Sequence, residues 1–229
     1  MSLRVRCFLV LGALSAFLVL MALSAAVYPG GSYHDRAYPR HHFWHNFLCD
    51  LLHQRALGGA PNLLGARLAT GGMLALVLSM GVYWTLAPAL MPGRPWLGRA
   101  CAMFGVLSSV GLVAVALTPS DRLPRLHTLA IVLATAPGLL AALSVVGGRL
   151  AEPGASWALR ALGGAALLAV AATSALFVIH TWFAGGYLRA LPAMQRVAAI
   201  LTVAWVGSTT ARLLAGEAAR GAWVSLISR

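Results

Sequence analysis

The sequence has very few charged residues, and this scarcity excludes an ordinary soluble domain. It contains no lysine and only five acidic residues, so that charged residues make up 10% of the 229 positions. A soluble domain carries about 25% charged and about 45–50% apolar residues, whereas 60% of this chain is hydrophobic. A surface this apolar could not be kept in water, so lipid must provide much of the protein's solvent.

The sequence also lacks the short motifs that identify common enzyme classes. It has no P-loop, no nucleophile elbow, no dinucleotide-binding fingerprint and no HExxH zinc motif. Cysteine is scarce, and no CxxC pair occurs among Cys7, Cys49 and Cys101. Two of these lie within apolar runs, where a thiol behaves as a small hydrophobe. A disulfide framework is therefore not expected.

The basic residues are all arginines, 17 of them, and they give the chain a net charge of +12. Nucleic-acid binders gather their positive charge on one face. Here the arginines stand singly or in pairs at the ends of apolar runs, as they do where spans meet anionic headgroups. We therefore predict membrane lipids, and no nucleic acid, as partners. Arginine without lysine, in an alanine-, glycine- and leucine-rich chain, indicates a GC-rich bacterial genome.

Long apolar runs dominate what is present. A membrane-spanning helix needs about 20 mostly apolar residues. Six segments qualify: residues 7–27, 68–90, 100–117, 128–147, 161–183 and 197–215. We therefore predict an all-α, polytopic membrane protein, a six-span helical bundle that forms a single integral membrane domain over residues 1–229.

The first span has some features of a signal peptide. It follows a basic start, MSLRVR, and Ser24-Ala25-Ala26 has the composition of a cleavage site. Its apolar run of about 20 residues is, however, longer than the 7–15 of a signal-peptide core. We expect this span to remain in the protein.

The one long segment between spans, residues 28–62, holds five of the seven histidines and two of the five acids. Within it, residues 41–54 have helical spacing, which predicts an amphipathic helix lying at the interface with Trp44 at headgroup depth. Its apolar face would consist of Phe43, Trp44, Phe47, Leu48, Leu51 and Leu52. Its polar face would consist of His42, His45, Asn46, Cys49, Asp50 and His53.

The number of spans predicts which polar residues share a side of the membrane. Six helices place the first, third and fifth loops together, and this collects all seven histidines and three of the five acids on one face. The arginines divide nine to eight between the two sides and barely decide the orientation. The basic N-terminus favours a cytoplasmic start in the inner membrane, with the histidine face outside the cytoplasm.

This one-sided group of histidines and acids could build a metal site. Zinc takes imidazole and carboxylate ligands, and a catalytic zinc keeps one position for water. The candidate zinc ligands are Asp50, His53, His127 and His180. Of these, Asp50, His127 and His180 are the candidate catalytic residues, and the wider polar face adds His45, Asn46 and Asp121. The corresponding function is a metal-dependent, membrane-embedded lipid hydrolase or transferase.

Several of these residues also have a purely structural interpretation. His180 can hydrogen-bond a neighbouring helix, and Asp121 with His127 can cap the start of the fourth span. A non-enzymatic lipid-binding or interaction protein is thus the alternative function. Haem held by His127 and His180 ranks lower, because b-type cytochromes usually carry more histidines within spans. A small transporter also ranks lower, because no charged residue lies clearly at mid-membrane.

Two segments, HNFLCDLL and TPSDRLPRLH, carry a resemblance to a known group. The chain resembles the bacterial and archaeal membrane proteins of domain-of-unknown-function family 998, which are distantly similar to the eukaryotic Frag1/DRAM/Sfk1 six-span proteins. The matching residues are Asn46, Asp50, Pro119, Asp121 and His127, with Gln195-Arg196 before the last span. Cys49 replaces the usual serine and Leu52 the usual glycine. The resemblance implies a six-span bundle and, through Frag1-like relatives, a connection with lipids, but no activity.

Overall fold

The computed structural model describes residues 1–150, 156–182 and 188–227, with the backbone alone for residues 149–150, 182 and 217–227. Six long helices lie in this part of the chain: α1 (Leu3–Ala26), α2 (Leu63–Trp84), α4 (Pro95–Leu117), α5 (Pro124–Leu150), α6 (Trp157–Trp182) and α7 (Leu191–Ile227). A short helix α3 (Ala87–Leu90) and a 3₁₀ helix η1 (Leu48–Leu52) complete the described elements, among which there is no strand.

All six long helices are long and apolar enough to cross a membrane. The predicted all-α, six-span integral membrane bundle is therefore confirmed. The helices extend a few residues beyond most of the predicted spans; α4, for example, begins at Pro95, because proline is well tolerated in the first helical turn. Residue 183, the predicted end of the fifth span, and Glu152 lie outside the described residues.

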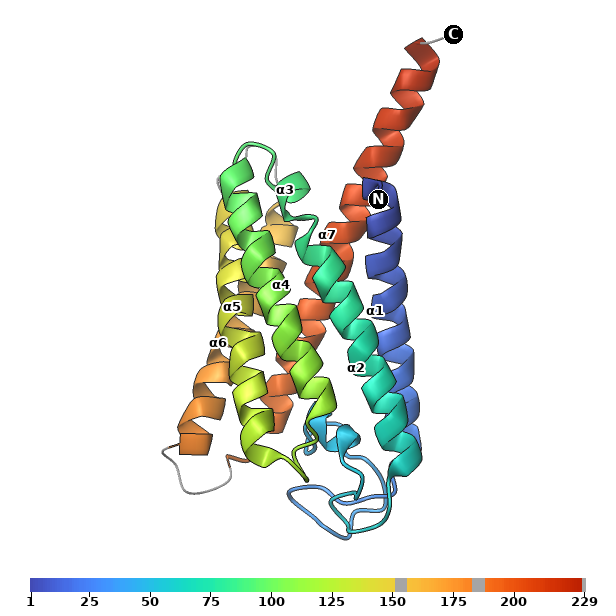
Figure 1. Cartoon of the computed structure of the whole chain (residues 1–229), viewed down its shortest axis with the longest axis vertical. Helices are drawn as coiled ribbons and strands as arrows, with labels where there is room; N and C mark the ends of the chain where they lie inside the picture. The colour runs from blue at the N-terminus through green and yellow to red at the C-terminus, as the bar shows by residue number, and fades with distance from the viewer. Residues whose placement is uncertain (151–155, 183–187, 228–229) are drawn as a thin grey trace.

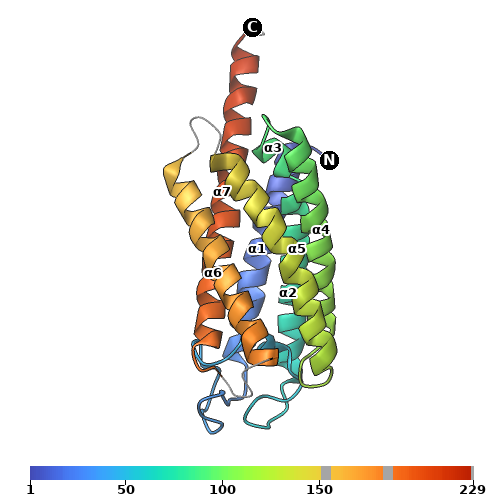
Figure 2. The same ribbon diagram turned by 90° about the vertical axis from the view of Figure 1, so that its left-hand side faces the viewer.

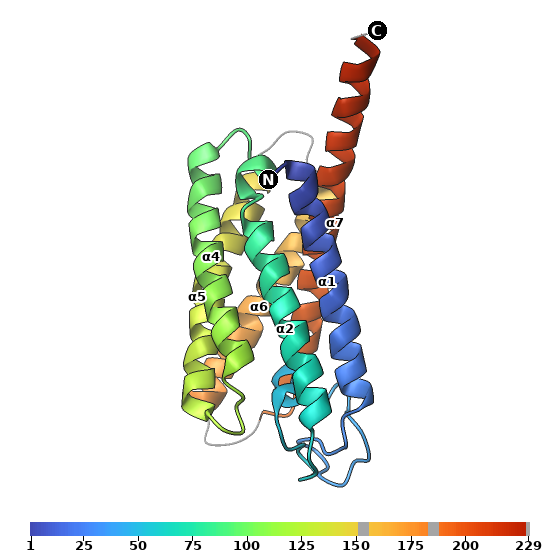
Figure 3. The same ribbon diagram turned by 45° about the vertical axis from the view of Figure 1, so that its right-hand side comes forward.

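The six spans form a ring. Each packs mainly against its two neighbours in the order α1, α2, α4, α5, α6, α7 and back to α1. Figures 1, 2 and 3 show from three sides that the helices run roughly along one common axis. A ring of six helices surrounds a central space that side chains must fill or leave open. This space decides where the protein can hold a ligand.

Aromatic side chains fill the central space at the end of the bundle where the N-terminus lies. The ring of Tyr83 lies 5.1 Å from that of Trp84 and 5.9 Å from that of Trp205, centroid to centroid. The Tyr83 hydroxyl lies 3.3 Å from Thr209 Oγ1, which joins α2 to α7 across the ring. This end of the bundle therefore has an aromatic core.

The opposite end carries the histidine-rich loops. Residues 28–62 and the turn between α4 and α5 both lie at the end away from the N-terminus (Figure 1). The C-terminal end of α6, with His180, lies at the same end. The expectation that these loops share one side of the bundle is thus confirmed for the described residues.

The amphipathic helix predicted over residues 41–54 is wrong in extent. Only Leu48–Leu52 is helical, as the single 3₁₀ turn η1, and residues 41–47 form turns and loop. Asn46 Oδ1 accepts a hydrogen bond from the backbone N–H of His42 (3.0 Å), and Asp50 Oδ2 accepts one from Phe47 (2.8 Å). Such side-chain bonds to nearby backbone compete with helix formation. Leu51, Leu52 and Asp50 are all buried, so η1 is part of the core and does not lie on the membrane surface.

Candidate functional site

A cavity of about 600 Å³ occupies the central space at the histidine-rich end of the bundle. Its walls are mostly apolar and come from all six spans. Representative wall residues are Phe17, Met73, Val115, Ile131, Phe177 and Val203. A volume of this size lies within the range of about 300–1,000 Å³ that is usual for small-molecule sites. The cavity is therefore large enough to hold a small-molecule ligand.

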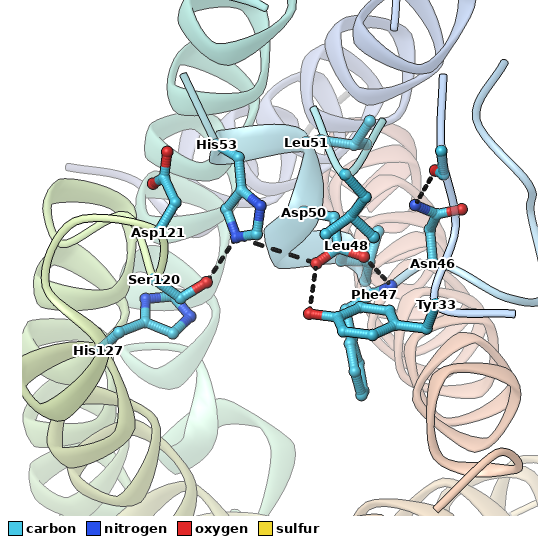
Figure 4. Close-up of polar contacts among 12 residues, drawn as sticks. Tyr33, Asn46, Phe47, Leu48, Asp50, Leu51, His53, Ser120, Asp121 and His127 are labelled. Atoms are coloured by element: carbon cyan, nitrogen blue, oxygen red, sulfur yellow. Dashed lines mark hydrogen bonds and ion pairs between the residues drawn. The ribbon is translucent and has the colours of Figure 1, made fainter. Parts of the chain in front are cut away.

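Polar groups gather at the loop end of this cavity. They come from η1, from the turn between α4 and α5, and from the loop-side ends of α5, α6 and α7: Asp50, Ser120, His127, His180 and Gln195. Figure 4 shows Asp50, Ser120 and His127 close to one another, with His53 between the carboxylate and the serine. The cavity thus has its carboxyl and imidazole groups at one end and mostly apolar walls beyond it.

Asp50 is the most deeply buried acid of the site, at 1% exposure. Its Oδ2 accepts the Phe47 N–H, and its Oδ1 accepts the Tyr33 hydroxyl at 3.3 Å. Burial raises the pKa of Asp50 from 3.8 to about 7, and these hydrogen bonds and the charge of Arg196 oppose the rise only in part. The carboxyl group can therefore carry or release a proton near neutral pH.

His53 links Asp50 to the turn between α4 and α5. Its Nε2 lies 2.6 Å from Ser120 Oγ and 3.9 Å from Asp50 Oδ1. In a serine–histidine–aspartate triad, the serine contacts Nε2 and the carboxylate contacts Nδ1. Here both groups approach the same nitrogen, so the three residues do not have triad geometry. Burial lowers the pKa of His53, which favours its neutral form.

His127 has one ring nitrogen engaged and one without a partner. Its Nδ1 lies 2.6 Å from the carbonyl oxygen of Thr118. A carbonyl can only accept, so Nδ1 carries the proton and donates it. The Nε2 atom is buried without a hydrogen-bond partner among the described residues, in a side chain that is 3% exposed and lines the cavity.

The loop that covers the polar end of the cavity is fixed by hydrogen bonds to two side chains near the start of α7. Gln195 Oε1 accepts the N–H of Leu48 at 2.8 Å. Arg196 donates to the carbonyl oxygens of Phe43 (3.0 Å) and Asn46 (3.3 Å). The Arg196 Nη2 that donates to Asn46 also lies 3.0 Å from His41 Nε2. Burial, together with the charge of Arg196, lowers the pKa of His41 to about 3. His41 is therefore a neutral acceptor.

Sequence analysis gave these α7 residues no role in the site. In the sequence, Arg196 is placed like any arginine that flanks a membrane span. Gln195 was named only as one of the residues that carry the family resemblance. A polar pair directly before an apolar run was the one available signal, and many spans begin that way.

The remaining predicted residues have structural contacts outside the cavity. His45 stacks on His34 at 3.9 Å and on His42 at 3.7 Å between ring centroids, within the loop. Asn46 is buried and donates to the Gly31 carbonyl oxygen at 3.0 Å. Asp121 accepts the Gln54 N–H at 3.0 Å, which ties the turn between α4 and α5 to the first loop. None of these three lines the cavity in the part of the chain that the structure describes.

The predicted zinc site is not formed. Over residues 1–150, 156–182 and 188–227, no group of three His, Cys, Asp or Glu side chains could hold a metal ion. Asp50 and His53 do approach each other, but His53 faces Ser120 and His127 directs Nδ1 to a backbone carbonyl. The four residues were correctly expected at one end of the bundle, but loop conformation and ring orientation keep them from converging.

The chain matches no protein family, and no curated protein or solved structure matches it. The candidate site is therefore interpreted from its own geometry.

Proposed function

We propose that this integral membrane protein binds a lipid-like amphiphile in its central cavity. The single observation that supports the proposal is a cavity of about 600 Å³ whose helical walls are mostly apolar and whose described carboxyl and imidazole groups lie at one end. An amphiphile has the same division between a polar head and an apolar tail. The tail would lie among the six spans, and the head would lie near Asp50 and His127.

Binding is favoured over the predicted metal-dependent hydrolase or transferase by the contacts at the polar end. No described group of side chains could hold a metal ion, and Ser120, His53 and Asp50 lack triad geometry. The Asp50 carboxylate and the Arg196 guanidinium instead hold loop backbone in place. Side chains that hold the cavity wall and the loop over its polar end in place are consistent with a binding protein.

The resemblance to domain-of-unknown-function family 998 belongs to the same proposal. Its matching residues include Asp50 and His127 at the cavity and Gln195-Arg196 at the loop anchor. A lipid-binding role is compatible with the lipid connection that the resemblance implies. A bacterial inner-membrane location with a cytoplasmic N-terminus is the corresponding placement.

The proposal is tested by filling the cavity. Ala199 on α7 lines it, whereas Ala204 on the same helix is exposed outside the ring. We expect Ala199→Phe to lower the amount of co-purifying lipid about tenfold, because the phenyl ring takes up space that the ligand needs and a tenfold loss of affinity corresponds to about 1.4 kcal/mol. Ala204→Phe is the matched control and should bind as the wild type does.

The measurement is native mass spectrometry of the purified protein, followed by lipid identification after extraction. A wild-type protein that carries no stoichiometric amphiphile, or equal retention by the Ala199→Phe and Ala204→Phe variants, would contradict binding in this cavity.

A further inference from the structure

The polar end of the cavity offers no cation to a ligand. The chain contains no lysine, and no arginine is among the described residues that line the cavity. Arg196, whose charge acts on Asp50, is 5% exposed and directs its guanidinium to the Phe43 and Asn46 carbonyl oxygens and to His41. Phosphate recognition normally relies on arginine, lysine or several free backbone N–H groups. The site therefore does not suit a phosphorylated head.

A buried carboxyl group further disfavours an anionic head. Asp50 lines the cavity at 1% exposure, so a phosphate beside it would add negative charge without a counterion. A cationic head is also poorly matched. Asp50 is the only acid among the described lining residues, and its two oxygens already accept from Tyr33 and Phe47. An uncharged head brings neither an unpaired negative charge nor an unpaired positive charge into the cavity.

One group at the polar end that calls for a ligand is His127 Nε2. Since Nδ1 donates to the Thr118 carbonyl oxygen, Nε2 of the neutral ring carries a lone pair and can only accept. It is buried at the cavity wall without a partner among the described residues. A buried acceptor without a partner is costly, and a ligand that donates to it removes that cost. The missing partner is thus a donor such as an O–H group.

Ser120 lines the cavity together with His127 (Figure 4). Its Oγ lies 2.6 Å from His53 Nε2 and also borders the cavity, and a hydroxyl oxygen has two lone pairs as well as one proton. The polar end therefore combines uncharged groups that can exchange hydrogen bonds with a ligand hydroxyl.

From this arrangement we infer that the cavity selects an uncharged lipid with a free hydroxyl group, which donates its O–H to His127 Nε2. The inference rests on the proposed lipid-binding function and names the class of head that the site accepts. Long-chain alcohols and other neutral lipids with a free hydroxyl belong to this class. Phospholipids and lipid phosphates do not.

The test offers the full-length protein three ligands that differ only in the head. The protein is reconstituted in phosphatidylcholine nanodiscs doped equally with hexadecanol, hexadecyl phosphate and hexadecylamine, and native mass spectrometry measures which of them it retains. We expect wild-type protein to retain hexadecanol over hexadecyl phosphate by about tenfold, the ratio that one buried hydrogen bond can supply. Hexadecylamine should be retained as poorly as the phosphate.

Two variants assign the preference to His127. His127→Leu should lose most of the preference for hexadecanol. His127→Gln, which can still donate to the Thr118 carbonyl oxygen and present an acceptor oxygen, should keep most of it and also controls for folding. His34→Leu, in the exposed part of the first loop, should behave as wild type.

The outcomes separate this inference from the proposed function. Equal or greater retention of the phosphate or the amine would overturn the inference and leave lipid binding in place. An unchanged alcohol preference in both His127 variants would overturn the role of His127. If wild-type protein retained none of the three ligands, the proposed function would fail together with this inference.

Discussion

At the scale of single residues, buried polar side chains organise this protein by bonding to backbone. Asp50 accepts a hydrogen bond from the N–H of Phe47. Asn46 accepts one from the N–H of His42 and donates one to the Gly31 carbonyl oxygen. Arg196 donates to two carbonyl oxygens of the same loop. Buried polar groups are nearly always satisfied in this way, and each unsatisfied one costs about 1–3 kcal/mol. His127 Nε2 departs from this pattern at the cavity wall, and the departure marks the place where a ligand would bind.

The protonation of Asp50 predicts how stability changes with pH. Its folded-state pKa of about 7 lies above the ordinary 3.8, so the folded protein holds a proton that the unfolded chain has already lost. The contribution to stability is fully present below about pH 4 and is lost as pH rises through about 7. Its upper limit is about 4 kcal/mol, since each pKa unit corresponds to about 1.4 kcal/mol.

The measurement is the free energy of unfolding of the detergent-solubilised protein between about pH 5 and pH 8, for wild type and Asp50→Asn. Asparagine keeps a hydrogen-bonding side chain but does not titrate. We expect wild type to lose more stability than the variant as pH rises. The difference between the two curves isolates Asp50 from His41 and His53, whose pKa values burial lowers. Parallel curves would show that Asp50 is ionised in the folded protein across this range.

At the scale of elements, close approach between helices depends on small residues. The tightest described approach of two helix backbones is α4 against α5, where a Cβ added at Gly111 would lie 2.3 Å from Ala134 N and 2.5 Å from its Cα. Beside it, Ser108 Oγ donates to the Ala134 carbonyl oxygen at 2.6 Å. Membrane helices commonly use small residues to bring backbones together, with hydroxyl groups bonding across the interface.

We therefore predict that Gly111→Ala destabilises the protein by about 1–3 kcal/mol, because a methyl group there must push two backbones apart. Gly12→Ala on α1 is the matched control, since an added Cβ at Gly12 meets nothing within 4 Å. It should change stability by less than about 1 kcal/mol, the difference in helix propensity between the two residues. Thermal unfolding in one detergent measures both, and equal midpoints would contradict close α4–α5 contact.

At the scale of the whole molecule, the six spans form a ring with an aromatic core at one end and a cavity at the other. Tyr83, Trp84 and Trp205 fill the end where the N-terminus lies, and the cavity occupies the loop end. A ligand would thus be held in the half of the bundle nearer the histidine-rich loops. Which leaflet this half faces depends on the orientation of the protein.

We predict that the histidine-rich loops face away from the cytoplasm, because the basic N-terminus favours the cytoplasmic side. The test uses a Cys49→Ala background, in which the remaining Cys7 and Cys101 are buried. In intact cells an impermeant maleimide should label Arg40→Cys in the first loop. It should label Arg94→Cys, at the opposite end, only after the cells are permeabilised. Both sites are exposed, so the reverse pattern would establish the opposite orientation.

The sequence alone is enough to predict the six spans and the end of the bundle at which the histidines lie. The thickness of the bilayer sets how long an apolar run must be to form a span, and this length can be recognised locally in the sequence. Whether the number of preceding spans is odd or even then predicts on which side each loop lies. Contacts in the tertiary structure set the conformation of the first loop, the direction of each histidine ring and the shape of the cavity. The backbone of Leu48 is hydrogen-bonded to Gln195, which lies 147 positions away in the sequence. The backbone of Phe43 is hydrogen-bonded to Arg196, which lies 153 positions away. Such contacts override local helical spacing, and no pattern along the chain contains them.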